Sequence, residues 1–182
     1  MKTTSKAVNR PNSTILKSVT KPGRYAGGEY GQIIKDKTRV KARFAFCFPD
    51  TYEIGMSNLG VRLLYGALNQ HPDIWCERVY DPWVDMQEQM KLHDLPLVAL
   101  ESGDPLDAFD FVAFTLQYEM SYTNVLNMLD LAGIPLRTRN RAEDAPLIIG
   151  GGPCAFNPEP VADFFDLFNI GEGENMLPSI VE

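Results

Sequence analysis

The chain has 182 residues, 45% hydrophobic and 23% charged, which is ordinary for a globular protein and enough for one well-filled domain. No stretch approaches the roughly 18 apolar residues of a membrane span, and the start of the chain lacks the apolar core of a secretory signal. The three cysteines are widely spaced, with no CxxC or Cys/His cluster. They argue against a zinc or iron–sulfur site in this chain and predict a reducing, cytoplasmic compartment.

The net charge of −7 is unevenly distributed along the chain. Up to Arg43 there are 11 Lys and Arg against 2 Asp and Glu, whereas the remainder has 6 against 22. A basic arm on an acidic body can bind nucleic acid, because clustered cations release counterions from phosphate. This arm lacks dense basic runs and interleaved aromatic residues. We therefore expect it to lie on its own acidic body or on another domain, with nucleic acid as the alternative.

Residues 1–39 are predicted to form this basic arm, and residues 40–182 one α/β domain. The arm is polar without a strong period up to about Thr20, so we expect it to be partly disordered. Segment 21–30 is turn-rich and is expected to extend over the surface.

Alternating strand and helix patterns fill the domain. Apolar runs predict strands at 40–48, 77–80, 110–116, 146–150 and 165–170, with a possible edge strand at 97–100. Helical patterns cover 85–93, 122–132 and 174–182. A further helix, capped by Asn58, carries one apolar stripe of Leu59, Leu63, Leu64, Ala67 and Leu68. This alternation predicts a flavodoxin-like (Rossmann-like) three-layer sandwich with a mainly parallel five-stranded sheet.

Two of the predicted strands end in glycines. Gly150, Gly151 and Gly152, followed by Pro153, leave room for close approach of a ligand, although a tight turn needs glycines as well. The second strand is followed by Gly171-Glu-Gly-Glu174, whose carboxylates could accept hydrogen bonds from a ligand or simply favour a helix start. Open α/β sheets bind ligands at the carboxyl ends of their strands, so these segments predict a site.

The loop at 50–60 follows the first strand and is expected to border the same crevice. It matches neither GxGxxG nor a phosphate-binding Walker loop. Asp50 and Glu53 could act as acid and base, but no histidine or nucleophile stands at a recognisable spacing, so no catalytic set is predicted. Tyr118, at the end of the central strand, could stack on a ring or serve packing.

The string GGPCAFNPEPVADFFDLFNIGEGE resembles the GGP…NPE…D…GEGE pattern of radical S-adenosylmethionine (radical SAM) proteins that carry an N-terminal cobalamin-binding-like domain. The likeness covers roughly residues 21–182. Further strings in the same order narrow it to one poorly characterised family: KPGRYAGGEYG, FCFPDTYEIGMSNLG, ERVYDPWVDM, PLVALESG and FTLQYEMSYTNVLNMLDLAGIPL.

The resemblance implies an accessory domain that precedes a radical SAM barrel. In such proteins the barrel's CxxxCxxC loop holds a [4Fe–4S] cluster that cleaves S-adenosylmethionine. Neither the motif nor the barrel is in this chain, so the chain alone is expected to be catalytically silent. Because the last helical signal runs to Glu182, we expect the native protein to continue into that barrel as its partner in cis, and expect no membrane partner.

The resemblance also makes cobalamin the candidate cofactor. Of the three signatures of cobalamin-binding domains, GG is met by Gly150 and Gly151, and SxL is met partly by Thr115-Leu-Gln117. The histidine of DxHxxG, the lower axial cobalt ligand, has no counterpart in 50–60. The predicted cofactor-binding residues are Ser57, Asn58, Thr115, Gln117, Tyr118, Gly150, Gly151, Gly152, Pro153, Glu172, Gly173 and Glu174, with no metal ligand.

Two other functions stay open at this point. One is a structural or docking module whose glycines serve only turns and which binds no ligand. The other is an RNA-contacting module of a radical SAM enzyme that modifies RNA, in which the basic arm would meet phosphate.

Overall fold

The computed structural model describes residues 10–181, which fold around a sheet of five parallel strands in the order β2-β1-β3-β4-β5. This order confirms the predicted flavodoxin-like arrangement. The strands are β1 (Ala42–Phe48), β2 (Ile74–Tyr80), β3 (Phe111–Thr115), β4 (Leu147–Gly151) and β5 (Leu167–Phe168).

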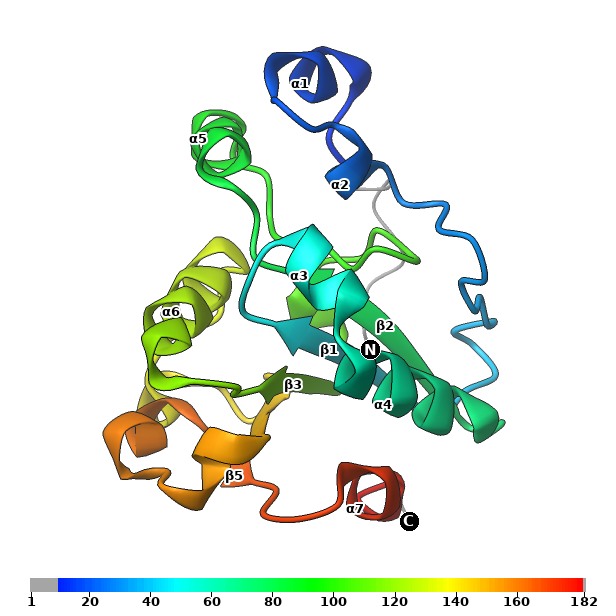
Figure 1. The fold of residues 1–182 in the computed structure, drawn as a ribbon, viewed down its shortest axis with the longest axis vertical. Helices are drawn as coiled ribbons and strands as arrows, with labels where there is room; N and C mark the ends of the chain where they lie inside the picture. Colours follow the sequence, from blue (N-terminus) through cyan, green and yellow to red (C-terminus); the bar gives the residue numbers. More distant parts are fainter. Residues whose placement is uncertain (1–9, 182) are drawn as a thin grey trace.

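Helices cover both faces of the sheet, with α5 and α6 on one side and α4 and α7 on the other (Figure 1). In the described part of the chain, no helix combines the length and apolar character of a membrane span. The α-helices are α1 (Ser13–Ser18), α2 (Gly23–Ala26), α3 (Tyr52–Ser57), α4 (Leu59–Gln70), α5 (Val84–His93), α6 (Tyr122–Leu131) and α7 (Gly173–Ser179). Short 3-10 helices span Leu106–Ala108, Glu119–Ser121, Thr138–Asn140, Pro153–Phe156 and Glu159–Phe164.

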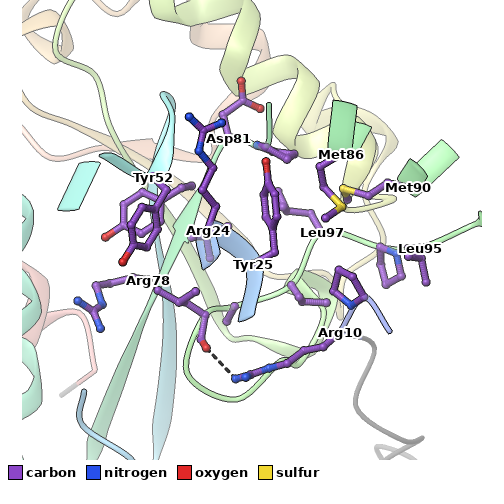
Figure 2. A pocket seen from close by; sticks show the side chains of 18 residues that line it. Arg10, Arg24, Tyr25, Tyr52, Arg78, Asp81, Met86, Met90, Leu95 and Leu97 are labelled. Carbon is purple, nitrogen blue, oxygen red and sulfur yellow. Dashed lines mark hydrogen bonds between the residues drawn. The ribbon is translucent and has the colours of Figure 1, made fainter. Parts of the chain in front are cut away.

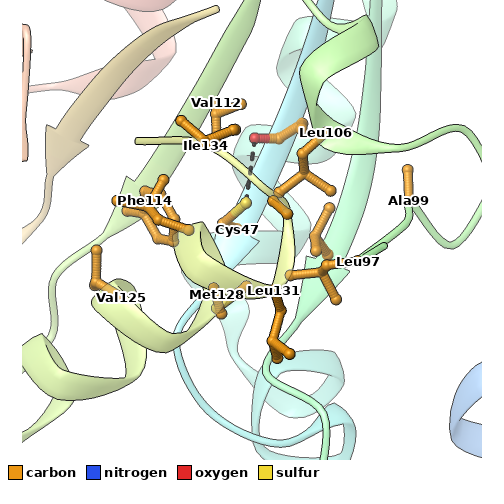
Figure 3. Close-up of a cluster of buried hydrophobic side chains, with 14 of the residues drawn as sticks. Cys47, Leu97, Ala99, Leu106, Val112, Phe114, Val125, Met128, Leu131 and Ile134 are labelled. Carbon is orange, nitrogen blue, oxygen red and sulfur yellow. Dashed lines mark hydrogen bonds between the residues drawn. The ribbon is translucent and has the colours of Figure 1, made fainter. Parts of the chain in front are cut away.

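The strands separate two hydrophobic cores because successive side chains point to opposite faces of a sheet. In β1, Phe44 and Phe46 pack toward α4 and α7, whereas Ala45 and Cys47 pack toward α5 and α6. Figure 3 shows part of the core on the α5 and α6 side, where Val112 and Phe114 of β3 meet α6. Burial on both faces explains why the strand at 110–116 is a continuous apolar run.

The β2 edge of the sheet holds two buried ion pairs. Glu77 is fully buried and pairs with Arg43 of β1, which also bonds Asp104 at 2.9 Å. Arg78 pairs with buried Glu101 at 2.7 Å, and the Arg78 backbone N–H donates to the same carboxylate. These pairs fasten the 101–104 turn to the sheet, because a buried charge left unpaired would cost about 3–5 kcal/mol.

The arm is more ordered than its sequence suggests. Asn12 caps α1 by accepting from the backbone N–H groups of Thr14 and Ile15, and Ile15 and Val19 are buried in the core beside α5. Poor order was predicted up to about Thr20, but Ser13–Ser18 form α1. Two apolar residues four apart are a weak periodic signal, and only the tertiary contact makes the helix. Residues 1–9 lie outside the described part of the chain.

Cations of the arm lie against the acidic body, as expected. Lys21 and Arg24 both pair with Glu53 at 2.9 Å, and Lys37 pairs with Asp104 at 3.0 Å. Lys35 donates to three backbone carbonyls at and beyond the end of α4, where the helix dipole favours a cation. The charges of these residues are therefore paired or hydrogen-bonded within the domain.

Three sequence expectations need correction. Segment 97–100 forms no strand of the sheet, since its only ladder contact in the described chain is the isolated bridge from Val98 to Pro105. The backbone N–H groups of Leu97, Ala99 and Leu100 donate instead to the carbonyls of Leu131, Asp104 and Arg78. The loop at 50–60 contains an unexpected short helix, α3. The stripe on α4 is only partly buried, because Leu59 and Leu63 are 65% and 52% exposed.

Candidate ligand site at the carboxyl edge of the sheet

All five strands are parallel, so their carboxyl ends meet at one edge. The chain leaves β1 toward β2 on one side and later returns to β3 on the other, which makes the crevice between β1 and β3 the switch point of the sheet. Polar residues follow the strand ends around this edge: Asp50, Asp81, Gln117, Tyr118 and Asn169.

A hollow of about 220 Å³ lies beside the ends of β3, β4 and β5, bounded by α4 and α7. Its floor is apolar, with Phe46, Ala113 and Ile149 from three strands. Seven of the predicted cofactor-binding residues converge on it: Thr115, Gln117, Gly151, Gly152, Glu172, Gly173 and Glu174.

The other five predicted residues lie outside this hollow. Asn58 caps α4 by accepting from the Val61 N–H at 3.0 Å, and the exposed Ser57 hydroxyl donates to the Ile54 carbonyl. Both side chains serve local helix ends. Pro153 begins a 3-10 helix, and Tyr118 and Gly150 have the contacts described below.

The glycines after β4 serve different purposes. A Cβ on Gly150 would come within 2.8 Å of the Phe168 ring, and one on Gly152 within 3.0 Å of the Leu116 carbonyl, at a φ of 90°. These two positions are therefore required by packing and by the turn. At Gly151 the nearest atoms would be 3.9 Å away, in Asn169, so this glycine leaves space that belongs to the hollow.

Asn169 is a site residue that sequence reasoning missed. It follows β5, is 5% exposed and lines the hollow, yet its Oδ1 has no hydrogen-bond partner among residues 10–181. Its Nδ2 donates only to the Gly171 carbonyl, at 3.5 Å. The available signal was a polar residue that directly ends an apolar run, but the missing partner depends on tertiary contacts.

At the switch point, Tyr118 spans the crevice by donating its hydroxyl to Asp50 Oδ2 at 3.1 Å. Asp81, after β2, accepts from Asn127 Nδ2 of α6 at 2.9 Å. Burial raises the pKa of Asp81 to about 6; the Asn127 hydrogen bond opposes the rise, and the Asp50 charge adds to it. A carboxyl group with such a pKa at a strand end can exchange a proton near neutral pH.

A second, smaller hollow of about 60 Å³ lies where the arm crosses the β2 end of this edge. Figure 2 shows Arg24 and Tyr25 of the arm among Tyr52, Asp81 and Met86 around it. Arg10 closes its rim by donating to the Leu100 and Glu101 carbonyls at 2.7 Å. This hollow is a seam between the arm and the domain, and most of its lining is apolar core.

Several residues expected to hold cobalamin have other roles in this structure. The 50–60 segment forms α3 and the cap of α4 and offers the cobalt no histidine. The space beside two of the three expected glycines, Gly150 and Gly152, is occupied by the Phe168 ring and the Leu116 backbone. Within residues 10–181, no group of three His, Cys, Asp or Glu side chains could hold a metal ion.

Comparisons with known proteins agree with the motif pattern. The family model for the N-terminal part of radical SAM proteins matches residues 60–182. An uncharacterized protein of Methanocaldococcus jannaschii is 29% identical over 131 residues, which cover 71% of this chain and 24% of the relative. The matched region thus spans about a quarter of that relative's length. No solved structure gives a significant match. The chain belongs to the radical SAM protein family, as an N-terminal domain of its members.

Proposed function

We propose that this chain is an accessory domain that docks the radical SAM domain of the same protein through the carboxyl edge of its sheet. It is catalytically silent alone, because the CxxxCxxC motif is absent from its sequence and no cysteine, lysine or histidine among the described residues lines either hollow. The three free cysteines support a reducing, cytoplasmic setting.

One observation carries the docking proposal: exposed apolar side chains follow the carboxyl ends of four strands. Met120 after β3 and Phe156 after β4 are 83% and 73% exposed. Leu59 and Leu63 at the start of α4 follow β1, and Ile170 follows β5 at 50% exposure. Exposed apolar side chains along one edge of the sheet suit contact with another domain.

The docking experiment is hydrogen–deuterium exchange on this chain and on a longer radical SAM protein that carries it. We expect slower exchange in the longer protein at 118–121, 153–157 and 170–176, because docking covers these segments. A Met120→Ser and Phe156→Ser double variant of the longer protein should lose that protection. Leu92→Ser, which changes a 72% exposed leucine late in α5, is the matched control. Equal exchange in both proteins would refute docking at this edge.

We further propose that this accessory domain does not hold cobalamin through its cobalt. Two observations support this: segment 50–60 has no histidine, and the space beside Gly150 and Gly152 is already occupied by protein atoms. Gel filtration after mixing with hydroxocobalamin should give no co-elution and no shift of the visible spectrum at about tens of micromolar. Retention of the cofactor with a shifted spectrum would contradict the proposal.

Among residues 10–181, Lys21, Arg24, Lys35 and Lys37 are engaged within the domain, which gives the RNA-contacting alternative no support. The alternative remains testable in the longer protein. RNA binding that weakens steeply with salt would support it, because each phosphate contact releases a counterion.

A further inference from the structure

The hollow beside β3, β4 and β5 combines an apolar floor with polar groups at one end. Phe46, Ala113 and Ile149 form the floor, and Leu64 and Leu177 close it from α4 and α7. Its volume of about 220 Å³ is many times the ~10–15 Å³ that one water requires. One bound water would therefore leave most of the space unfilled.

Asn169 supplies an unused acceptor in this hollow. Its side chain lies between Gly151 and Gly173, since a Cβ on either glycine would be 3.9 Å or 3.7 Å from Nδ2. The walls on both sides of the amide are therefore bare backbone. A buried carbonyl oxygen without a partner costs roughly 1–3 kcal/mol, and a ligand that donates a hydrogen bond would remove that cost.

We propose that this hollow binds an adenine-type nucleoside that carries no phosphate, with the exocyclic amine of the base donating to Asn169 Oδ1. An asparagine amide pairs with the edge of adenine by accepting from N6 and donating to N7. Oδ1 is free for the first bond, and the 3.5 Å contact of Nδ2 with the Gly171 carbonyl is weak enough to yield to the second. The apolar floor and the glycine walls suit a flat ring.

The rim selects against a phosphate. Glu172 and Glu174 line the opening, and no Lys or Arg is among the described residues around it. Carboxylates accept hydrogen bonds from ribose hydroxyls, as they do in dinucleotide-binding folds, but repel an anionic tail. The same rim accommodates a cationic tail, so the adenosyl group could come from a free nucleoside or from S-adenosylmethionine.

Isothermal titration calorimetry of this chain with four probes tests the proposal. We expect adenosine to bind and inosine, which has an oxygen in place of the exocyclic amine, to bind at least about tenfold more weakly. AMP should also bind more weakly than adenosine. S-adenosylmethionine distinguishes the sources: tighter binding than adenosine identifies the adenosyl compound, and weaker binding identifies the free nucleoside.

Asn169→Leu should abolish adenosine binding without loss of folding, because it replaces an unsatisfied buried amide with an apolar group of similar size. Gly151→Ala, whose Cβ would enter the hollow without a clash, should also weaken binding. Asn175→Leu applies the same substitution to an exposed position on α7 and should leave binding unchanged. The proposal is overturned if no probe binds at about millimolar concentration, if inosine equals adenosine, or if folded Asn169→Leu retains binding.

Discussion

Replacing Asp81 by Asn should stabilise the chain near neutral pH. Burial raises the pKa of Asp81 from its ordinary 3.8 to about 6, so folding makes this carboxyl group harder to ionise. Between these two pH values the native state binds more protons than the unfolded state, and stability falls as pH rises. A pKa difference of about two corresponds to a cost of roughly 3 kcal/mol that is fully present above pH 6 and vanishes below 3.8.

Asparagine removes this cost and keeps an oxygen that can accept from Asn127 Nδ2. Allowing for partial solvation, we expect Asp81→Asn to raise the free energy of unfolding by about 1–3 kcal/mol near neutral pH, with no gain below pH 3.8. Urea unfolding at a series of pH values measures the difference. Asp144→Asn, on an exposed turn, is the control and should show little effect. A stability difference that is independent of pH would refute the reasoning.

Three further outcomes follow from the packing. Glu77→Ala should lower the free energy of unfolding by about 3–5 kcal/mol, because it leaves the Arg43 guanidinium buried without its main partner. An equal loss for Arg43→Ala and for the double variant would show that the two residues are coupled. Additive losses would contradict this coupling. Gly152→Ala should cost about 1–3 kcal/mol through its φ of 90°, whereas Gly151→Ala should be nearly neutral in thermal unfolding, and the reverse order would contradict the turn assignment. Alkylation of the native chain should modify Cys154 first, because the other two cysteines are fully buried with raised thiol pKa values, and mass spectrometry identifies the labelled site.

The sheet could be predicted because each strand carries its own local signal. Segment 110–116 is apolar on both faces, and β3 is indeed covered on both sides. The cap at Asn58 was also readable, since it depends on residues three apart in sequence. Helix α1 was not, because Ile15 and Val19 become a buried face only where α5 lies beside them.

The candidate site divides in the same way. Glycines and carboxylates at strand ends pointed to the carboxyl edge, and seven of the twelve named residues share one hollow there. The sequence could not separate Gly151, which leaves space, from Gly150 and Gly152, which Phe168 and the Leu116 backbone require to be small. That distinction depends on atoms contributed by other strands.

By itself, the sequence determined the five parallel strands, helices α4 to α7 and the family, because these depend on local periodicity and on motifs read along the chain. Only the tertiary structure decided which cations of the arm pair with carboxylates of the domain, that burial raises the pKa of Asp81, and that Asn169 has an acceptor without a partner among residues 10–181. Each of these depends on the burial and charge of groups brought together from distant segments.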